Sequence, residues 1–348
     1  MPAPKKVTLQ MIAAEASLST AAVSMALRHH PRIGAETRKR VHEIARRMGY
    51  QANPYVTALM THIRRARPVT MHSSLAMIHT FPEKVLWTSN EPTRRLINGI
   101  RQRAEQLGFD AELFWYYEPG ISPARLSRIL RSRGIRGVIF LPWPQHTPTL
   151  ELDWKWFAAA TINYNVQEPA LHGVAEDFFG NVRQAFVELW RRGCRRIGFV
   201  CKAYHEPESR YRLVAAYMRM ISLYREAGAA DIEVLTLADW RKEPVLAWYE
   251  RWRPDAIITL DWDLGRWFPQ AGVRVPEELS ISLVNQCPKF PMFSGVDPNY
   301  EFLGAAAVDL VAEQINNNET GLPVSPKEVL VHGRWAEGTQ VRPALAAE

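Results

Sequence analysis

Apolar positions near the start of the chain predict two short helices that are joined by a tight polar break. In the first helix these positions follow the i, i+3, i+4, i+7 spacing of one buried face, at Leu9, Ile12, Ala13 and Ala16. Residues 17–19 interrupt this period, and Thr8 and Ser19 are placed to cap the two helices through their hydroxyls. The inward face of the second helix is predicted at Ala22, Val23, Ala26 and Leu27. Its outward face is predicted at Thr20, Ala21, Ser24 and Met25.

A third helix is predicted from Ala35 to Met48, with Gly49 as its C-cap. Its apolar face consists of Val41, Ile44, Ala45 and Met48. Two short helices that meet at such a break are typical of a helix-turn-helix unit, whose second helix enters the major groove of DNA. An ordinary helical hairpin is the alternative that these patterns leave open.

Beyond Arg67 short apolar runs alternate with amphipathic segments of helix length, which predicts βαβ units, parallel sheets and helices on both faces. The runs that we interpret as strands are SLAMIHTF, DAELFWYY, GVIFL, AAATINY, HGVAED, RIGFVC, IEVLTL, DAIITL and LSISLVN. This region spans about 270 residues, which is more than one hydrophobic core usually fills. The predicted fold class is therefore an all-α headpiece followed by an α/β core.

Charge separates these two regions. Residues 1–67 contain 12 lysines and arginines against three glutamates, whereas the rest of the chain has 31 basic and 33 acidic residues. The whole basic excess of the chain, whose net charge is +7, therefore lies in its first fifth. This distribution is typical of a domain that neutralises DNA phosphates, and it favours the DNA-reading interpretation over the hairpin.

The segments VTLQMIAAEASLSTAAVSMAL and PRIGAETRKRVHEIARRMGYQANP resemble, nearly residue for residue, the DNA-binding headpiece of the lac repressor (LacI/GalR) family of bacterial transcription regulators. The resemblance implies a helix-turn-helix domain at 1–49, a hinge helix and linker at 50–72, and a core at 73–342. This core would consist of two parallel-sheet subdomains of the type I periplasmic-binding-protein fold, joined by crossovers near residues 165, 290 and 323. The expected bounds are about 73–164 and 291–322 for the first subdomain, and about 166–289 and 324–342 for the second.

By position in the family pattern, the residues expected to contact DNA lie in the caps, the second helix, the following turn and the hinge. They are Thr8, Ser19, Thr20, Ala21, Ala22, Ser24, Met25, His29, Tyr50, Asn53, Thr57 and Leu59. The resemblance implies that Leu59 is wedged into the minor groove. Its alternative role is that of an apolar helix residue that packs in the dimer. Met25 and Thr57 stand where the family usually has arginines, so Met25 offers a base only apolar contact.

Ligands of open α/β sheets bind beyond the carboxyl ends of the strands, and several predicted strands are followed by aromatic or polar side chains. The aromatic candidates are Trp87, Trp143 and Tyr164, whose flat faces suit a sugar or a heterocycle. The polar candidates, taken from the family pattern, are Asp177, Arg210, Arg212, Asp261, Asp263 and Asn285. The register leaves the choice between Arg210 and Arg212 open. Core packing, helix capping and salt bridges between subdomains are the alternative roles of these residues.

The sequence contains none of the common enzyme motifs: it lacks a glycine-rich phosphate loop, a GxSxG elbow and an HExxH pair. Cys194, Cys201 and Cys287 have no metal-ligand spacing, and an odd number of cysteines is typical of reduced thiols in the cytosol. The sequence shows no signal peptide and no long apolar segment. We therefore expect a cytoplasmic, nucleoid-associated bacterial protein that is not an enzyme and uses no cofactor, metal or membrane.

The resemblance implies a homodimeric transcription regulator, in this family most often a repressor, that reads a near-palindromic operator. A small molecule would bind between the core subdomains and change operator affinity, and the aromatic strand ends lead us to expect a sugar. Two alternatives stay open: a regulator that needs no effector, and one that senses a purine or a phosphorylated metabolite. No leucine heptads follow Arg342, which favours a dimer over a tetramer.

Overall fold

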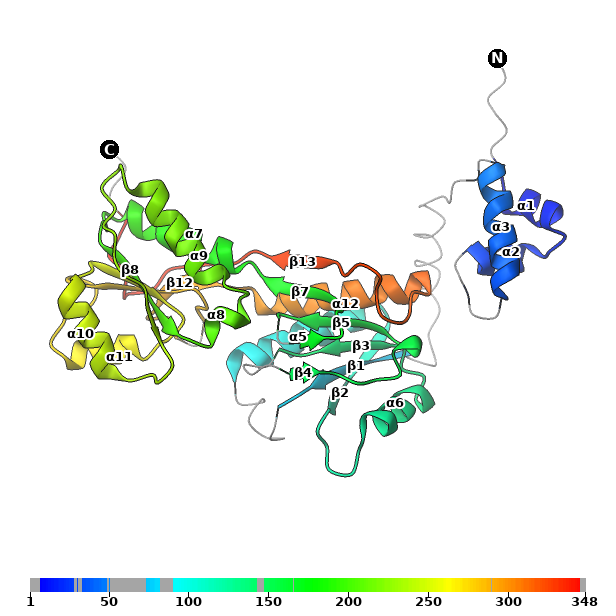
Figure 1. The fold of residues 1–348 in the computed structure, drawn as a ribbon, viewed down its shortest axis with the longest axis horizontal. Helices are drawn as coiled ribbons and strands as arrows, with labels where there is room; N and C mark the ends of the chain where they lie inside the picture. Colours follow the sequence, from blue (N-terminus) through cyan, green and yellow to red (C-terminus); the bar gives the residue numbers. More distant parts are fainter. Residues whose placement is uncertain are drawn as a thin grey trace, which may run out of the picture.

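In the computed structural model, three N-terminal helices form a small headpiece, and a larger α/β core contains two six-stranded sheets (Figure 1). This architecture confirms the predicted fold class. The structure describes residues 7–27, 30, 33–48, 50, 73–81, 90–142, 147–164, 166–288 and 290–344.

The headpiece consists of α1 (Leu9–Ala16), α2 (Thr20–Leu27) and α3 (Ala35–Arg47). One side chain from each helix, Ile12, Val23 and Val41, is completely buried in the centre. These are positions that the apolar spacing places inward, so the pattern of the predicted headpiece core is confirmed.

Both predicted N-caps of the helix-turn-helix pair are also confirmed. The Thr8 hydroxyl accepts a hydrogen bond from the backbone N–H of Met11 at 3.4 Å, and the Ser19 hydroxyl accepts one from Ala22 at 3.1 Å. The third helix ends at Arg47 with Met48 as its cap, one residue before its predicted end. The predicted cap Gly49 lies outside the described residues.

The first sheet has the order β13-β7-β5-β3-β1-β2, and all neighbouring strands run parallel. We call this sheet and its helices the first subdomain. Its strands are β1 (Ser73–His79), β2 (Phe109–Trp115), β3 (Gly137–Phe140), β5 (Ala158–Ile162), β7 (His172–Glu176) and β13 (Glu328–Val331). Its helices are α5 (Glu91–Gln106), α6 (Pro123–Ser132) and α12 (Tyr300–Asn317). Helices α5 and α12 pack on one face of the sheet and α6 packs on the other.

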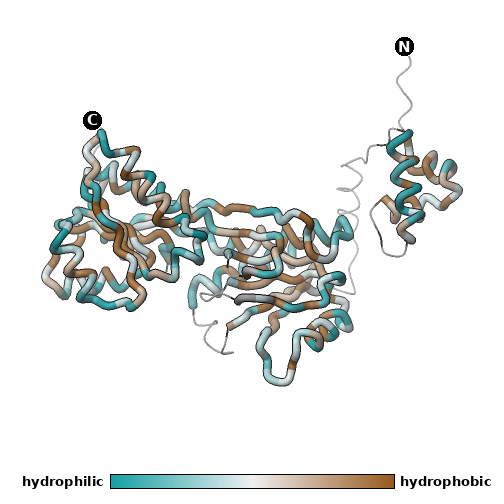
Figure 2. Tube along the Cα trace, viewed as in Figure 1, coloured by the Kyte–Doolittle hydropathy of each residue, from teal (hydrophilic) through white to brown (hydrophobic). Residues whose placement is uncertain are grey.

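The second sheet has the order β14-β12-β11-β10-β8-β9, with β14 antiparallel to β12, and forms the second subdomain. Its strands are β8 (Ile197–Lys202), β9 (Leu235–Leu237), β10 (Ala256–Thr259), β11 (Ser280–Leu283), β12 (Ser294–Asp297) and β14 (Arg334–Ala336). Helices α7 (Phe178–Arg191) and α9 (Arg212–Tyr224) cover one face. The other face is covered by α10 (Lys242–Trp252) and α11 (Leu264–Gln270). Figure 2 shows the hydrophobic strands of this sheet enclosed by helices with polar outer positions.

All nine apolar runs that predict strands form strands of these two sheets. Within the part of the chain that the structure describes, five strands were missed: β4 (Thr147–Thr149), β6 (Val166–Glu168), β12, β13 and β14. They are three or four residues long, and β13 lies at a sheet edge where most of its side chains are exposed. Such strands carry too few buried apolar positions to stand out from loops in the sequence.

The expected crossover positions are wrong by about ten residues each. Strand β7 is hydrogen-bonded to β5 in the first sheet, so the chain first crosses after Glu176 and not near 165. It crosses back after Asp297, the end of β12, and a third time between Val331 and Arg334. The physical reason is that strands of both sheets have the same buried apolar pattern. Sheet membership depends on long-range pairing, which this pattern does not encode.

Helices α5 and α12 approach each other closely because each contributes a glycine to the contact. A Cβ atom on Gly304 would lie 2.3 Å from the carbonyl oxygen of Leu96, and one on Gly99 would lie 2.0 Å from that of Glu301. Both distances are far below van der Waals contact, so only glycine fits at these two positions.

We therefore expect Gly304→Ala to lower the free energy of unfolding by about 1–3 kcal/mol, because the added methyl group forces the two helices apart. Urea denaturation measures this change. Gly173→Ala in β7 is the matched control, since the nearest atom to its added Cβ would be 3.7 Å away. A loss of stability that is equal in both variants would contradict the close helix contact.

Candidate nucleic-acid interface and ligand site

The helix-turn-helix pair presents small side chains on its outer surface. Thr20 and Ala21 at the start of α2 are exposed, whereas Ala22, Ser24 and Met25 are half-buried. The capping hydroxyls of Thr8 and Ser19 accept hydrogen bonds from their own helices, and each still has a proton to donate to a phosphate. Tyr50 packs against the headpiece core and its backbone N–H binds the carbonyl of Ala45 at 2.9 Å.

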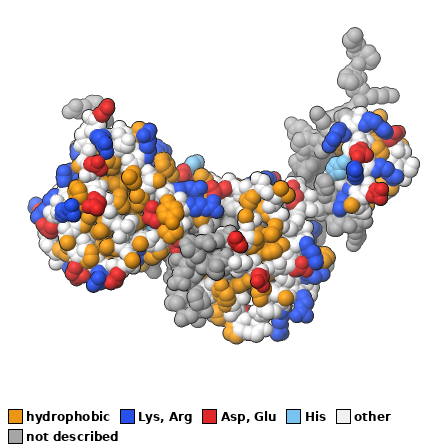
Figure 3. Space-filling view, viewed as in Figure 1, with side chains coloured by type: hydrophobic (Ala, Val, Ile, Leu, Met, Phe, Trp, Pro, Cys, Tyr) orange, Lys and Arg blue, Asp and Glu red, His pale blue; other side chains and the backbone are white. Residues whose placement is uncertain are grey.

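Two arginines of α3 hold the headpiece together. Arg40 donates to the carbonyl oxygen of Ala16 at 3.1 Å, and Arg47 forms an ion pair with Glu15 at 2.5 Å. Other basic residues of α3, such as Lys39 and Arg46, are exposed to solvent. Figure 3 shows lysine and arginine side chains spread over this part of the molecule. The headpiece thus combines a groove-sized helix with a basic surface.

Several predicted site residues lie outside the described residues: His29, Asn53, Thr57, Leu59, Trp87 and Trp143. The minor-groove wedge at Leu59 stays a prediction.

A buried cluster of charged side chains lies at the carboxyl ends of β8 and β10, and we call it the strand-end cluster. Asp261 is its centre and is only 3% exposed. Its carboxylate lies 2.7 Å from the ammonium of Lys202 and 3.8 Å from the imidazole of His205. His205 begins α8 (His205–Glu208) and also lies 3.7 Å from the Glu208 carboxylate. Asp261 was predicted, whereas Lys202, His205 and Glu208 were not.

The pairing shifts the pKa values of Asp261 and His205 in opposite directions. Burial by itself raises the pKa of Asp261, but hydrogen bonds from His205 and Lys202 outweigh it and hold that pKa below its usual value. Burial lowers the pKa of His205, and the contacts with Asp261 and Glu208 outweigh this and raise it. The cluster therefore combines the carboxylates of Asp261 and Glu208 with the amine of Lys202 and the imidazole of His205, groups that can exchange hydrogen bonds with a polar ligand.

Tryptophan residues lie near the strand-end cluster. Trp262, which follows Asp261 in the chain, is half exposed and packs edge-on against Phe290 at 4.4 Å between ring centroids. The ammonium of Lys202 lies 5.4 Å from the ring of Trp240. The predicted residue Asp263 accepts a hydrogen bond from the indole of Trp240 at 3.1 Å, so it positions this ring. The flat face of an indole ring such as that of Trp240 suits a sugar or a heterocycle.

Two further buried polar side chains, Asn285 and Glu176, lie at strand ends of the two subdomains. The predicted residue Asn285 follows β11, and its carbonyl oxygen is buried without a hydrogen-bond partner among the described residues. Across from the second sheet, Glu176 ends β7, is buried, and exchanges two hydrogen bonds of 3.2 Å with Asn163. Burial raises the pKa of Glu176 to about 7, although Asn163 and His205 partly oppose the shift.

The remaining predicted residues Tyr164, Arg210 and Arg212 meet beside β13. The two arginines belong to the second subdomain, where Arg212 begins α9. Their guanidinium groups lie 4.3 and 4.6 Å from the centroid of the Tyr164 ring. Both also pair with the Glu328 carboxylate, Arg210 at 3.6 Å and Arg212 at 3.2 Å. Burial raises the pKa of Tyr164, and the neighbouring Glu328 adds to the shift. Both arginines therefore bridge the two subdomains.

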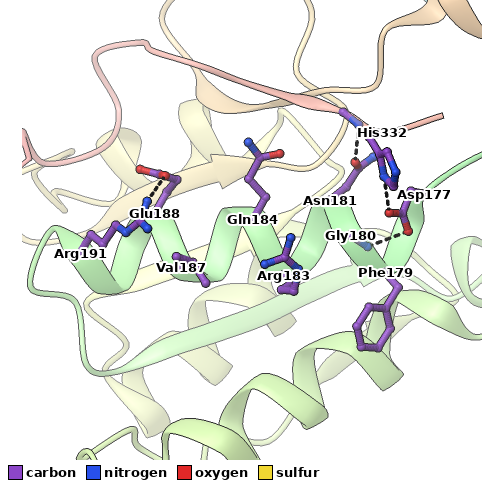
Figure 4. Close-up of a pocket in the computed structure, with 11 residues that line it drawn as sticks. Asp177, Phe179, Gly180, Asn181, Arg183, Gln184, Val187, Glu188, Arg191 and His332 are labelled. Atoms are coloured by element: carbon purple, nitrogen blue, oxygen red, sulfur yellow. Dashed lines mark hydrogen bonds and ion pairs between the residues drawn. The ribbon is translucent and has the colours of Figure 1, made fainter.

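Asp177 has a different role from that of the other predicted ligands. Its carboxylate caps α7 through the backbone N–H of Gly180 at 2.9 Å, and it lies 2.8 Å from the imidazole of His332. Asn181, one turn further, accepts from the backbone N–H of Gly333 at 3.1 Å. Figure 4 shows these residues at one end of a groove that runs along α7. Asp177 thus ties the first crossover to the third.

The residues of the strand-end cluster that the sequence analysis did not predict share one feature of their position in the chain. Lys202, His205, Trp240 and Trp262 all follow predicted strands of the second subdomain, where a ligand site is expected. Glu328 gave no such signal because β13 itself was not predicted.

Two family models match this chain, one over the headpiece and one over part of the core. Residues 8–53 match the family model "Bacterial regulatory proteins, lacI family", and residues 186–337 match that of a "Periplasmic binding protein-like domain". The chain thus combines a lacI-family DNA-binding domain with a periplasmic-binding-protein-like domain. Comparison of this chain with curated proteins gives no match.

Solved structures similar to this chain include several regulators. A complex of the transcriptional regulator CelR with cellobiose is 18% identical, with a TM-score of 0.56 over 96% of this chain and 100% of that chain. The lac repressor dimer bound to operator and the anti-inducer ONPF is 16% identical, with a TM-score of 0.54 over 97% and 99%. The regulator CcpA of Lactococcus lactis is 14% identical, with a TM-score of 0.57 over 78% and 100%. At these identities the likeness shows the fold.

Among the helices that the structure describes, none has the length and apolarity that crossing a bilayer requires.

The raised pKa of Glu176 predicts a pH-dependent effect of Glu176→Gln. The unfolded chain releases this proton near the ordinary value of 4.5 and the folded protein only near 7, so folding stability falls as the pH rises between these values. Glutamine removes that cost, and the variant should be more stable than the parent by up to about 3 kcal/mol at pH 8. At pH 4 we expect no such gain.

Urea denaturation of both proteins between pH 4 and pH 8 measures the difference. Glu105→Gln, at an exposed position of α5, is the control and should show a flat difference. A Glu176→Gln effect that does not vary with pH would contradict the raised pKa.

Proposed function

We propose that this protein is a sequence-specific DNA-binding transcription regulator, acting as a repressor, whose operator affinity is set by a small molecule bound between its two subdomains. It acts as a homodimer on a near-palindromic operator, because each headpiece reads one half-site and the dimer is two-fold symmetric. The observation that carries this proposal is the capped helix-turn-helix pair, α1 and α2, in a basic domain that matches the lacI family.

The surface of α2 decides what the headpiece reads. Its exposed residues Thr20 and Ala21 are small, so they allow the helix to approach the bases closely and offer contacts to a thymine methyl or a base edge. Much of the affinity then comes from phosphate contacts made by the basic surface. We infer that the operator is read by a few apolar and hydroxyl contacts together with the shape of the duplex.

We propose a sugar as the effector and the strand-end cluster as its binding site. The Asp261 carboxylate, the Lys202 ammonium and the rings of Trp240 and Trp262 are the acceptor, donor and flat surfaces that sugar hydroxyls and CH groups need. Similar structures were solved with such ligands: CelR with cellobiose, and a LacI family regulator from Enterococcus faecium with ribose. Glu176 and Asn163 would close the site from the first subdomain.

Ligand binding can change operator affinity only if the ligand binds two arrangements of the subdomains with different free energies. A coupling free energy of about 1–3 kcal/mol changes operator affinity by about 5- to 150-fold. The crossovers are the place where such a change in subdomain angle would be transmitted to the first subdomain and its attached headpiece.

The test is selection of bound fragments from genomic DNA by the full chain, with and without cellobiose and ribose. We expect one near-palindromic sequence whose occupancy changes with a sugar. Ala21→Asp should lower affinity for the selected operator at least tenfold, since it places a negative charge against the duplex. Ala215→Asp, at an exposed position of α9, is the matched control and should bind normally.

Two outcomes would contradict the proposal. Operator binding that survives Ala21→Asp would exclude α2 as the reading helix. A palindrome whose occupancy responds to neither sugar would leave the DNA-binding function standing and exclude these effectors.

A further inference from the structure

A cavity lies at the edge of the first sheet where the parallel strands begin. Helix α12 ends at Asn317, and residues 318–327 then pass over the start of β5, where the backbone N–H of Gly321 donates to the carbonyl oxygen of Phe157 at 3.0 Å. This loop, the end of α12 and the residues at the starts of β3, β7 and β13 line the cavity, which we call the edge pocket. Its volume of about 600 Å³ lies within the range of small-molecule sites.

The edge pocket is separate from the sugar site proposed above. The carboxyl end of β7 leads into the first crossover, whereas the edge pocket lies at the amino end of the same strand. None of its lining residues belongs to the strand-end cluster or to the groups that bridge the two subdomains beside Tyr164. A ligand in the edge pocket would therefore contact a different set of side chains.

A buried imidazole offers one hydrogen-bond donor to the edge pocket. His172 begins β7 and is only 8% exposed. Its Nδ1 accepts a hydrogen bond from the backbone N–H of Lys327 at 2.9 Å, so the ring proton is on Nε2, and no residue that the structure describes accepts it. Burial and the charge of Lys327 lower the pKa of His172, and the carboxylates of Glu319 and Glu313 oppose this only in part. The ring is therefore a neutral donor at neutral pH.

The charges around the edge pocket leave one positive charge over. Its charged lining residues are Arg38, Arg136, Lys327 and Glu319. Arg136 is exposed and forms no ion pair within the described part of the chain. Lys327 lies 3.4 Å from the Glu313 carboxylate, and both side chains are more than half exposed, so this pair is weak. Three cations thus face two carboxylates, and Arg136 is available to an anion.

The arrangement of the donors indicates which anion fits. The Arg136 guanidinium, the Lys327 ammonium and the imidazole N–H come from three strand starts, and the hydroxyls of Thr320 and Ser325 come from the loop. A phosphate group accepts hydrogen bonds through several oxygens that point in different directions, which suits donors from separate segments. It would fill only part of the edge pocket, and the remaining polar lining suits a body with hydroxyl groups.

We propose that the edge pocket is a second ligand site, which takes a small phosphate ester of a sugar or polyol. Its phosphate group would pair with Arg136 and Lys327 and accept the Nε2 proton of His172. A hydroxyl group of the ester would donate to the Glu319 carboxylate. Because Arg38 of the headpiece helix α3 also lines the edge pocket, the bound ester would contact both the headpiece and the first subdomain.

The test is isothermal titration calorimetry of the full chain with sn-glycerol 3-phosphate and D-glucose 6-phosphate, using neutral glycerol and D-glucose as matched controls. We expect at least one ester to bind at least tenfold more tightly than its neutral counterpart. An excess of cellobiose or ribose should not abolish this binding, because the two sites share no residue.

Two substitutions assign the binding to the edge pocket. Arg136→Gln should weaken it at least tenfold, and so should His172→Asn, whose amide oxygen can still accept from the backbone N–H of Lys327 while the Nε2 donor is lost. Arg128→Gln is the control, since Arg128 is an exposed arginine of α6 that does not line the edge pocket, and it should bind like the parent. An unchanged midpoint of urea unfolding shows that a variant is folded.

Four results would overturn the proposal: no binding of either ester, equal binding of esters and neutral compounds, ester binding that survives both substitutions, or an equal loss in Arg128→Gln. Operator binding and its response to cellobiose or ribose are measured separately. Failure of this proposal therefore leaves the proposed function intact, and the reverse also holds.

Discussion

The guanidinium group of Arg95 connects the two subdomains. From α5 in the first subdomain it binds both carboxylate oxygens of Asp297, the last residue of β12, at 2.9 and 3.0 Å. It also binds both oxygens of Glu301 in the first turn of α12 at 2.7 Å. The Arg95 side chain is only 12% exposed, so these bonds are shielded from water. We therefore expect a change in the angle between the sheets to occur around this contact.

A chain of hydrogen bonds connects the other two crossovers to Asp297. Asp297 accepts from the backbone N–H of Asn299, and the Asn299 amide binds the carbonyl oxygen of His332 at 2.8 Å. His332 in turn contacts Asp177, which caps α7. All three chain crossings are thus connected by polar side chains. Directional bonds of this kind break and re-form at discrete angles, which suits a hinge with two arrangements.

The groups that face a ligand lie on both sides of this hinge. Glu176 ends the strand that leads into the first crossover, and the charge of His205 in the second subdomain acts on its pKa. Arg212 and Arg210 reach from the second subdomain to Tyr164 and Glu328 in the first. A molecule that binds any of these groups therefore exchanges contacts between subdomains for contacts with itself. A bound ligand can therefore stabilise one angle between the two subdomains relative to another.

Local patterns predicted the parts of the fold that local physics decides. The headpiece helices follow from apolar spacing and the hydroxyls of Thr8 and Ser19, and the longer strands from runs of buried apolar residues. Asp261 was found because it directly follows such a run, at a position that the family pattern gives to ligand contacts. The crossovers were misplaced because strands of either sheet look alike, and Glu328 was missed because β13 is short and exposed. His205 and Lys202 join Asp261 only through the tertiary fold, so no spacing in the sequence reveals their contact.

Hydrogen–deuterium exchange of the full chain with and without the selected operator duplex tests most directly whether DNA binding and the hinge are coupled. Amides that open with the hinge exchange faster than those of the buried strands, so their rates report its state. The account predicts that operator binding changes exchange in the crossovers, at residues 177–181, 297–300 and 331–334, as well as in the headpiece. Protection confined to the headpiece, with unchanged exchange at all three crossovers, would contradict it.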